Sequence, residues 1–279
     1  MKTYRILSAE TKDTQDLKGM VEVYEEIAAS KMQKVRHQIT LTRDFFERLE
    51  QLSDEIGADF ETIPEKSVNR EIAVLIATNT GLYGDIVDNT LRLFLTYIKT
   101  HPVDVFVVGK LGAELLKTMA PDVKFQSYFL PDDNFDQAKF LRLMAEIFPY
   151  RKILVFYGKF QNIAVQLPVM AKISSDILPK TYATLQELKN KRLQYLYEPS
   201  LMAISEIFAK DIVASLMEQI FQESFLAKFA SRVMYLDQSI DKVTDYLQSL
   251  DSQKRQIKKK LLNKKQNAVS SSLLARGLA

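Results

Sequence analysis

A glycine turn is the first place in this sequence where phosphate chemistry could occur. Residues 77–84 read ATNTGLYG and follow the apolar run IAVLI. A loop that cradles phosphate needs several glycines whose N–H groups converge on the anion, and nucleotide triphosphatases add a Lys-Ser/Thr pair. Gly81 and Gly84 are present, but no lysine follows them, and the GKLG stretch at 109–112 also lacks this pair. The pattern therefore predicts a structural strand-to-helix turn without a nucleotide.

Few other residues could support catalysis or bind a metal. The chain has no cysteine, which excludes disulfides, thiolate metal sites and cysteine nucleophiles. Only His37 and His101 could act as imidazole ligands or bases, and they lie on either side of a predicted domain boundary. The aspartate pairs at 85/88 and 132/133 are interpreted as helix caps, because aspartate favours the first turn of a helix. We expect no catalytic residue, no cofactor and no metal.

Length and charge describe a globular chain with one unusual end. The 279 residues are 47% hydrophobic and 26% charged, which suits one or two units with a sizeable core. No apolar run is long enough for a membrane span and the amino end lacks a signal peptide core, so neither membrane insertion nor export by that route is expected. Residues 251–276 carry eight basic side chains against Asp251, a charge of +7, so the rest of the chain sums to −4 within a net +3.

The two ends of the chain are predicted to be long helices. No proline occurs before Pro64 or after Pro199, and a proline costs about 3 kcal/mol inside a helix. Near the carboxyl end an apolar seam repeats at alternating steps of four and three, interrupted only by Lys254; its members are Leu236, Ile240, Val243, Leu247, Leu250, Ile257 and Leu261. Shorter amino-terminal seams are Leu17, Met20, Tyr24, Ile27 and Phe45, Leu49, Leu52, Ile56. We expect the two helices to pair with each other.

Between these ends the pattern changes to short apolar runs that alternate with amphipathic stretches. Strands are predicted at 72–78, 103–109, 123–130 and 153–158, and helices around 91–99, 111–119 and 137–147. This alternation favours a Rossmann-like α/β domain with a mainly parallel sheet. The predicted fold is thus α/β plus a long antiparallel coiled coil, with residues 1–64 and 201–279 forming the coiled coil and residues 65–200 the inserted α/β domain.

Five short motifs, in this order, resemble the γ subunit of rotary F-type ATP synthases. Thr14-Gln15 and IAASKM at 27–32 resemble the family's T-Q and V-A-A-S-K-M, with about three extra residues between them. The turn at 78–84 resembles S-D-R-G-L-C-G, although its Asp, Arg and Cys positions hold Asn79, Thr80 and Tyr83. The most specific match is YGKFQNIAVQLP at 157–168, which resembles the family's Y-x-K-F-x-N-x-x-x-Q-x-P hairpin. YEPS at 197–200 and KQNAVS at 265–270 resemble the remaining two motifs.

The resemblance implies a divergent central-stalk shaft that is not itself catalytic and that turns inside a hexameric ring of α- and β-type nucleotide-binding subunits. It implies further contacts with a small ε-type rotor subunit and a membrane rotor ring, and a location in the cytoplasm, peripheral to the membrane. The residues expected to meet the ring are Lys254, Arg255, Lys258, Lys265, Gln266, Thr80 and Tyr24.

Two alternatives stay open on the sequence. One is a rotor paralogue that serves transport or motility. The other is a coiled-coil adaptor or a nucleic-acid-binding protein with a basic tail. Nucleic acid is disfavoured because no aromatic residue follows Tyr246, so the tail has no platform for base stacking.

Overall fold

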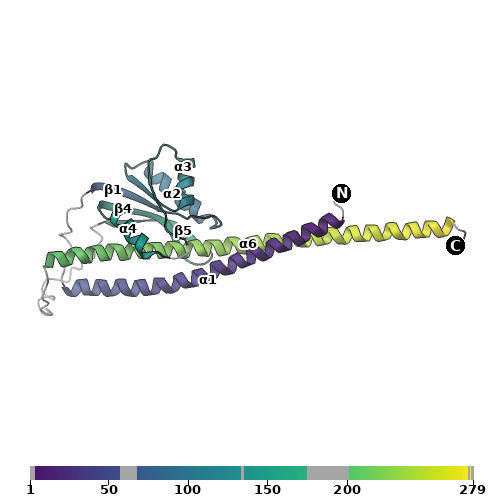
Figure 1. Ribbon diagram of the computed structural model, residues 1–279, viewed down its shortest axis with the longest axis horizontal. Helices are drawn as coiled ribbons and strands as arrows, with labels where there is room; N and C mark the ends of the chain where they lie inside the picture. The colour runs from purple at the N-terminus through teal and green to yellow at the C-terminus, as the bar shows by residue number, and fades with distance from the viewer. Residues whose placement is uncertain (1–3, 57–67, 133–134, 175–200, 276, 278–279) are drawn as a thin grey trace. The chain divides into compact units, whose positions relative to one another are not determined.

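The computed structural model describes residues 4–56, 68–132, 135–174, 201–275 and 277 (Figure 1). Within it the chain divides into two compact units. One contains residues 28–232, and the other contains residues 1–27 together with residues 233–279. The two ends predicted to be helical form α1 (Tyr4–Ile56) and α6 (Leu201–Ala275), and both helices run through both units.

The unit of residues 28–232 is built on a five-stranded sheet in the order β3-β2-β1-β4-β5. Four strands are parallel, and β5 pairs antiparallel with β4 at one edge. The strands are β1 (Val68–Ile76), β2 (Asp104–Val108), β3 (Gln126–Tyr128), β4 (Tyr150–Phe160) and β5 (Gln166–Ser174). The prediction of a mainly parallel sheet is confirmed, and the YGKFQNIAVQLP motif forms the β4–β5 hairpin.

Helices cover both faces of this sheet, which explains the continuous apolar runs of its central strands. On one face, α2 (Ile86–Ile98) and α3 (Lys110–Met119) pack in a core that includes Leu75, Phe94 and Phe156. On the other face, α4 (Gln137–Ile147) shares a core with residues 32–39 of α1 and 213–230 of α6. The central strands β1, β2 and β4 thus contribute alternate side chains to two cores.

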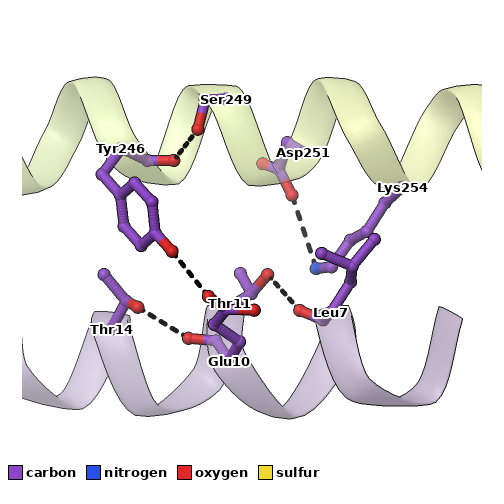
Figure 2. Close-up of polar contacts among 8 residues, drawn as sticks. All are labelled: Leu7, Glu10, Thr11, Thr14, Tyr246, Ser249, Asp251 and Lys254. Carbon is purple, nitrogen blue, oxygen red and sulfur yellow. Dashed lines mark hydrogen bonds and ion pairs between the residues drawn. The ribbon is translucent and has the colours of Figure 1, made fainter. Parts of the chain in front are cut away.

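The unit of residues 1–27 and 233–279 is an antiparallel pair of helices. Figure 2 shows the Tyr246 hydroxyl donating to the Glu10 carboxylate across the pair. On α6 the residues of the predicted seam from Leu236 to Ile257 are each buried or half-buried. Leu250 is 1% exposed, whereas Leu261 is 56% exposed. This difference follows from the pairing, because α1 begins at Tyr4 and the antiparallel register leaves Leu261 beyond its end.

The predicted seam of α1 was wrong by one position. Leu17, Met20, Tyr24 and Ile27 are 45–58% exposed and lie outside the helix pair. The seam is formed instead by Leu7, Thr11, Thr14, Lys18, Val21 and Glu25, which are buried or half-buried. These positions continue, at the same steps of four and three, the buried set Ala28, Met32, Val35 and Ile39. Phe45 is exposed as well, and the side chains of Leu49, Leu52 and Ile56 lie outside the described residues.

The division at 64/65 and 200/201 stays a prediction. The segments 57–67 and 175–200, which contain these boundaries and the YEPS motif, lie outside the described residues.

We expect Leu250→Ala to cost about 2 to 5 kcal/mol in the free energy of unfolding, because it removes a fully buried side chain from the seam. Leu261→Ala is the matched control on the same helix and should change this free energy by about 0.5 kcal/mol or less, since Leu261 is mostly exposed. Urea denaturation followed by the helical circular dichroism signal measures both values. Equal values for the two variants would contradict the seam.

Candidate functional site: a turn held by two basic residues of α6

The glycine turn of residues 77–84 is a structural turn, as predicted. It leaves the end of β1, where the Ala77 N–H donates to the Val108 carbonyl. Gly84 has a φ of 58°, a conformation that glycine adopts without strain. Leu82 also has a positive φ, 67°, which costs a residue with a side chain about 1 to 2 kcal/mol. Something in the surrounding structure must therefore hold Leu82 in this conformation.

Asn79 connects the turn to the loop after β3 and to the first residue of α3. Its backbone N–H donates to the Asp132 carboxylate at 2.7 Å, and its side-chain amide donates to the Leu130 carbonyl. Its side-chain oxygen accepts from the Lys110 N–H at 3.0 Å. The interpretation of Asp132 as a helix cap was therefore wrong, because Asp132 braces the turn.

Other aspartates take the positions at the helix starts. Asp136 caps α4 by accepting from the Lys139 N–H at 3.1 Å. Asp85 holds the cap position of α2 without a capping hydrogen bond from its side chain, and Asp88 lies in the first turn of that helix.

The GKLG stretch at 109–112 lets α3 approach the turn. A Cβ at Gly109 would lie 2.7 Å from the Thr78 carbonyl oxygen, and one at Gly112 would lie 2.1 Å from the Ala77 Cβ. Because both positions are glycine, the N–H groups of Leu111 and Gly112 donate to the Thr78 carbonyl at 2.9 and 3.4 Å. The first turn of α3 thus gives its donors to the Thr78 carbonyl and to the Asn79 side chain of the protein itself.

Lys228 of α6 lies beneath the turn and is 3% exposed. Its ammonium group donates to the Ala77 carbonyl and lies 5.3 Å from the centroid of the Phe225 ring. Burial lowers the pKa of Lys228 to about 8, and the negative charge of Asp132 opposes the shift. Sequence reasoning missed this residue, whose only signal is a lone lysine in the apolar stretch FLAKFA.

Arg232, one helical turn after Lys228, holds the outer part of the same turn. Its guanidinium donates to the Gly81 carbonyl at 2.7 Å and, at 3.3 Å each, to the Leu82 carbonyl and the Thr80 hydroxyl. It also lies 3.8 Å from the centroid of the Tyr83 ring, a cation–π distance. Sequence reasoning missed Arg232 too, because no pattern marks an arginine that binds carbonyl groups 150 residues away.

A third contact links α6 to the end of β4. The Tyr157 hydroxyl donates to the Glu223 carboxylate at 3.0 Å, and burial raises the pKa of Tyr157 well above its ordinary value. The chain passes from β1 to β2 on one side of β1, and from β3 it returns to β4 on the other side. The strand order therefore reverses between β1 and β4. Ligands of open α/β sheets bind at the carboxyl ends of such strands. In this chain, side chains of α6 occupy that position.

The residues expected to meet a ring fall into three environments. Arg255, Lys258, Lys265 and Gln266 are exposed along α6. Lys254 is half-buried in the seam and pairs with Asp251 at 3.4 Å (Figure 2). Tyr24 is exposed on α1, and Thr80 is exposed on the turn, where it accepts from Arg232. Thr80 belongs to the unit of residues 28–232, and the other six belong to the second unit.

Within the described part of the chain, no group of three His, Cys, Asp or Glu side chains could hold a metal ion. His37 is exposed on α1, and His101 stacks on Tyr97 with 4.1 Å between the ring centroids. None of the helices in the described ranges has a stretch apolar and long enough to cross a lipid bilayer.

Comparisons with known proteins agree on one family. A family model described as "ATP synthase" matches residues 3–260. The ATP synthase gamma chain of Christiangramia forsetii is 26% identical over 238 residues, which cover 78% of this chain and 79% of the relative. That of Buchnera aphidicola is 20% identical over 286 residues, with 97% of each chain covered. Among solved structures, a chain of the Euglena gracilis mitochondrial ATP synthase has the same fold, with a TM-score of 0.68 at 15% identity over 98% of this chain and 94% of that one.

The difference in stability between the parent and Lys228→Met should depend on pH, which would reveal the buried charge. An unfolded lysine titrates near pH 10.4, so between about pH 8 and pH 10 the unfolded chain binds more protons at this residue than the folded chain. The stability of the parent relative to Lys228→Met should therefore rise with pH across this window. Urea denaturation at pH 7 and pH 10 measures the change, with the exposed Lys242→Met as the control. A pH-independent difference between the parent and Lys228→Met would contradict the assignment.

Proposed function

The chain belongs to the ATP synthase gamma-chain family and is a central-stalk subunit of a rotary ATP synthase, and on this premise we propose that its paired helices are the rotating shaft. The helices turn inside a hexameric ring of α- and β-type subunits. Each angle of the asymmetric shaft favours a different state of the nucleotide sites around it, which is how rotation and nucleotide chemistry are coupled.

The exposed apolar stripe of α1 is the observation that carries this proposal. Leu17, Met20, Tyr24 and Ile27 are about half exposed although they lie on one side of a regular helix. Farther along α6, beyond the start of α1, Leu261, Leu262 and Val269 are 52–56% exposed. Apolar patches of this kind mark surfaces that bind other proteins. A surrounding ring would cover these residues on both helices.

The basic end of α6 supports the same assembly. Arg255, Lys258 and Lys265 are exposed and would meet acidic loops of the ring, and Gln266 would contact a catalytic subunit beside them. Because Lys254 is already paired with Asp251 in the seam, its contribution to the ring contact is smaller than that of the three exposed residues.

The α/β unit would bind the small ε-type rotor subunit and the membrane rotor ring, which places the chain at the cytoplasmic face of a membrane without inserting into it. In this assembly the chain is not catalytic, because the catalytic sites belong to the ring. Nucleotides of α/β sheets usually bind where the strand order reverses, here between β1 and β4. Side chains of α6 occupy this position in the chain, which supports the non-catalytic role.

Co-purification tests the proposed function. The tagged full chain should carry with it two homologous nucleotide-binding subunits, and the complex should hydrolyse ATP. The chain alone should give no saturable heat with magnesium and ATP in calorimetry. Recovery of the chain without these subunits, or magnesium-dependent ATP binding by the isolated chain, would contradict the assignment.

Charge reversal tests the ring contact. Arg255→Glu, Lys258→Glu and Lys265→Glu together should lower the ATPase turnover of the complex, most strongly at low salt, where charges are least screened. A single neutral substitution should have little effect, because an exposed ion pair contributes about 0 to 1 kcal/mol. The neutral triple variant Arg255→Gln, Lys258→Gln and Lys265→Gln is the matched control and should lower turnover less. Turnover of the charge-reversed variant equal to that of the parent would show that the basic end is only a solvated face.

A further inference from the structure

The amino-terminal part of α1 turns a mostly polar side toward α6. Two of the six seam residues are apolar, and the six are Leu7, Thr11, Thr14, Lys18, Val21 and Glu25. The hydroxyls of Thr11 and Thr14 donate to carbonyl groups within α1 itself, at 2.7 and 2.6 Å. Burial and the negative charge of Asp237 raise the pKa of Glu25, so the charged form of Glu25 is disfavoured in this seam.

A more apolar stripe lies one position earlier along the helix. Leu17, Met20 and Tyr24 are 51–58% exposed, and each directly precedes a residue of the seam. An α-helix turns about 100° per residue, so one extra residue would bring each of them to the place that its neighbour now holds. A π-turn adds one residue to a single turn of an otherwise regular helix. A single π-turn would therefore exchange the two stripes.

The extra residue fits between Tyr24 and Ala28. Ala28 is 1% exposed, and Met32, one turn later, belongs to the core of the sheet. A shift confined to residues 4–24 leaves both of them buried, whereas a shift of the whole helix would not. The boundary between the two compact units crosses α1 at the same place, after Ile27.

Each register suits a different half of this segment. The shifted seam would consist of Ile6, Glu10, Asp13, Leu17, Met20 and Tyr24. It gains three apolar side chains from Leu17 to Tyr24, but it places two carboxylates, those of Glu10 and Asp13, where Thr11 and Thr14 now lie. It also removes the hydrogen bond from Tyr246 to Glu10. Because both seams contain two charged residues, neither register has a large advantage over the other.

We propose that residues 4–24 of α1 have two registers against α6, the one in the structure and one shifted by a single position through a π-turn before Ala28. In the shifted register α6 itself covers Leu17, Met20 and Tyr24. A partner protein that binds these three side chains selects the register in which they are exposed. The two registers belong to the free chain, so their existence does not depend on the proposed function.

Fluorine NMR of the free full-length chain tests the two registers. The chain has no cysteine, so Met20→Cys can carry a single trifluoromethyl label. Lys18→Leu with Glu25→Leu makes the seam in the structure apolar and gives the reference signal for that register. An alanine inserted after Ile27 supplies the extra residue and gives the reference for the shifted register. The parent should show both signals in a ratio within about tenfold, or one signal between them if exchange is fast, since register shifts take microseconds to milliseconds.

Val23→Cys is the control for the label. Val23 is 56% exposed, and Tyr24, whose place it would take in the shifted register, is 53% exposed. Its signal should therefore be the same in the parent and in the Lys18→Leu, Glu25→Leu variant. If the insertion variant does not fold, a Met20→Cys signal that differs between these two chains still supports two registers. An identical Met20→Cys signal in both chains overturns the proposal.

The assembled complex tests the selection by a partner, and this step rests on the proposed function. A label at Val21→Cys reports on the seam, because Val21 faces α6 in the structure and would take the exposed place of Glu22 in the shifted register. Binding of the nucleotide-binding subunits should leave only the Val21→Cys signal of the Lys18→Leu, Glu25→Leu reference. Persistence of the shifted signal would overturn the selection. If the free chain has one register, this inference fails, while co-purification of the ring with the parent chain still supports the proposed function.

Discussion

The burial of α6 is the constraint on which the rest of the structure depends. From Ile212 to Ser231 this helix is buried on nearly all sides, with its aromatic residues in the core that also receives α4 and β1. From Val233 onward only the side facing the seam is buried. A helix that is apolar all round needs neighbours on every side, whereas a helix with one apolar stripe needs a single partner. The change between the two requirements falls at Arg232.

This change in burial explains why the polar contacts between α6 and the turn after β1 lie near Arg232. Lys228 and Arg232 occupy the last two turns before α6 loses its surrounding neighbours, and both donate to the turn that follows β1. Lys228 is buried and lies near Asp132, so its charge is partly compensated. Arg232 is less buried and can keep a charge at the surface. Because burial decreases along α6, Lys228 contacts the turn as a buried charge, whereas Arg232 contacts it as a charge near the surface.

Sequence periodicity predicted β1 to β4, because short apolar runs mark them, but it did not predict β5, in which polar residues interrupt the apolar ones. On α6 only one stripe of the part after Val233 is apolar, and periodicity assigns that stripe to the seam. On α1 the same reasoning failed. Periodicity detects an apolar stripe but does not say what the stripe faces, and α1 carries two candidate stripes that differ by one position.

The site could be predicted only in part. The sequence was sufficient to show that the turn at 77–84 lacks the residues for phosphate, because that conclusion depends on neighbours along the chain. The residues that hold the turn come from a helix about 150 positions later. A single lysine or arginine in a helical stretch has no spacing partner, so its role depends on tertiary packing that a sequence pattern does not contain.

The register of α1 can be decided by comparing what each stripe would bury. A shift by one position would place Leu17, Met20, Tyr24 and Ile27 in the seam, but it would also replace the buried Met32 and Val35 by Lys31 and Lys34. Burying an apolar side chain contributes about 1.5 to 3 kcal/mol, whereas a buried unpaired charge costs several kcal/mol. The apolar stripe of Leu17, Met20, Tyr24 and Ile27 is exposed, where a partner protein can bury it.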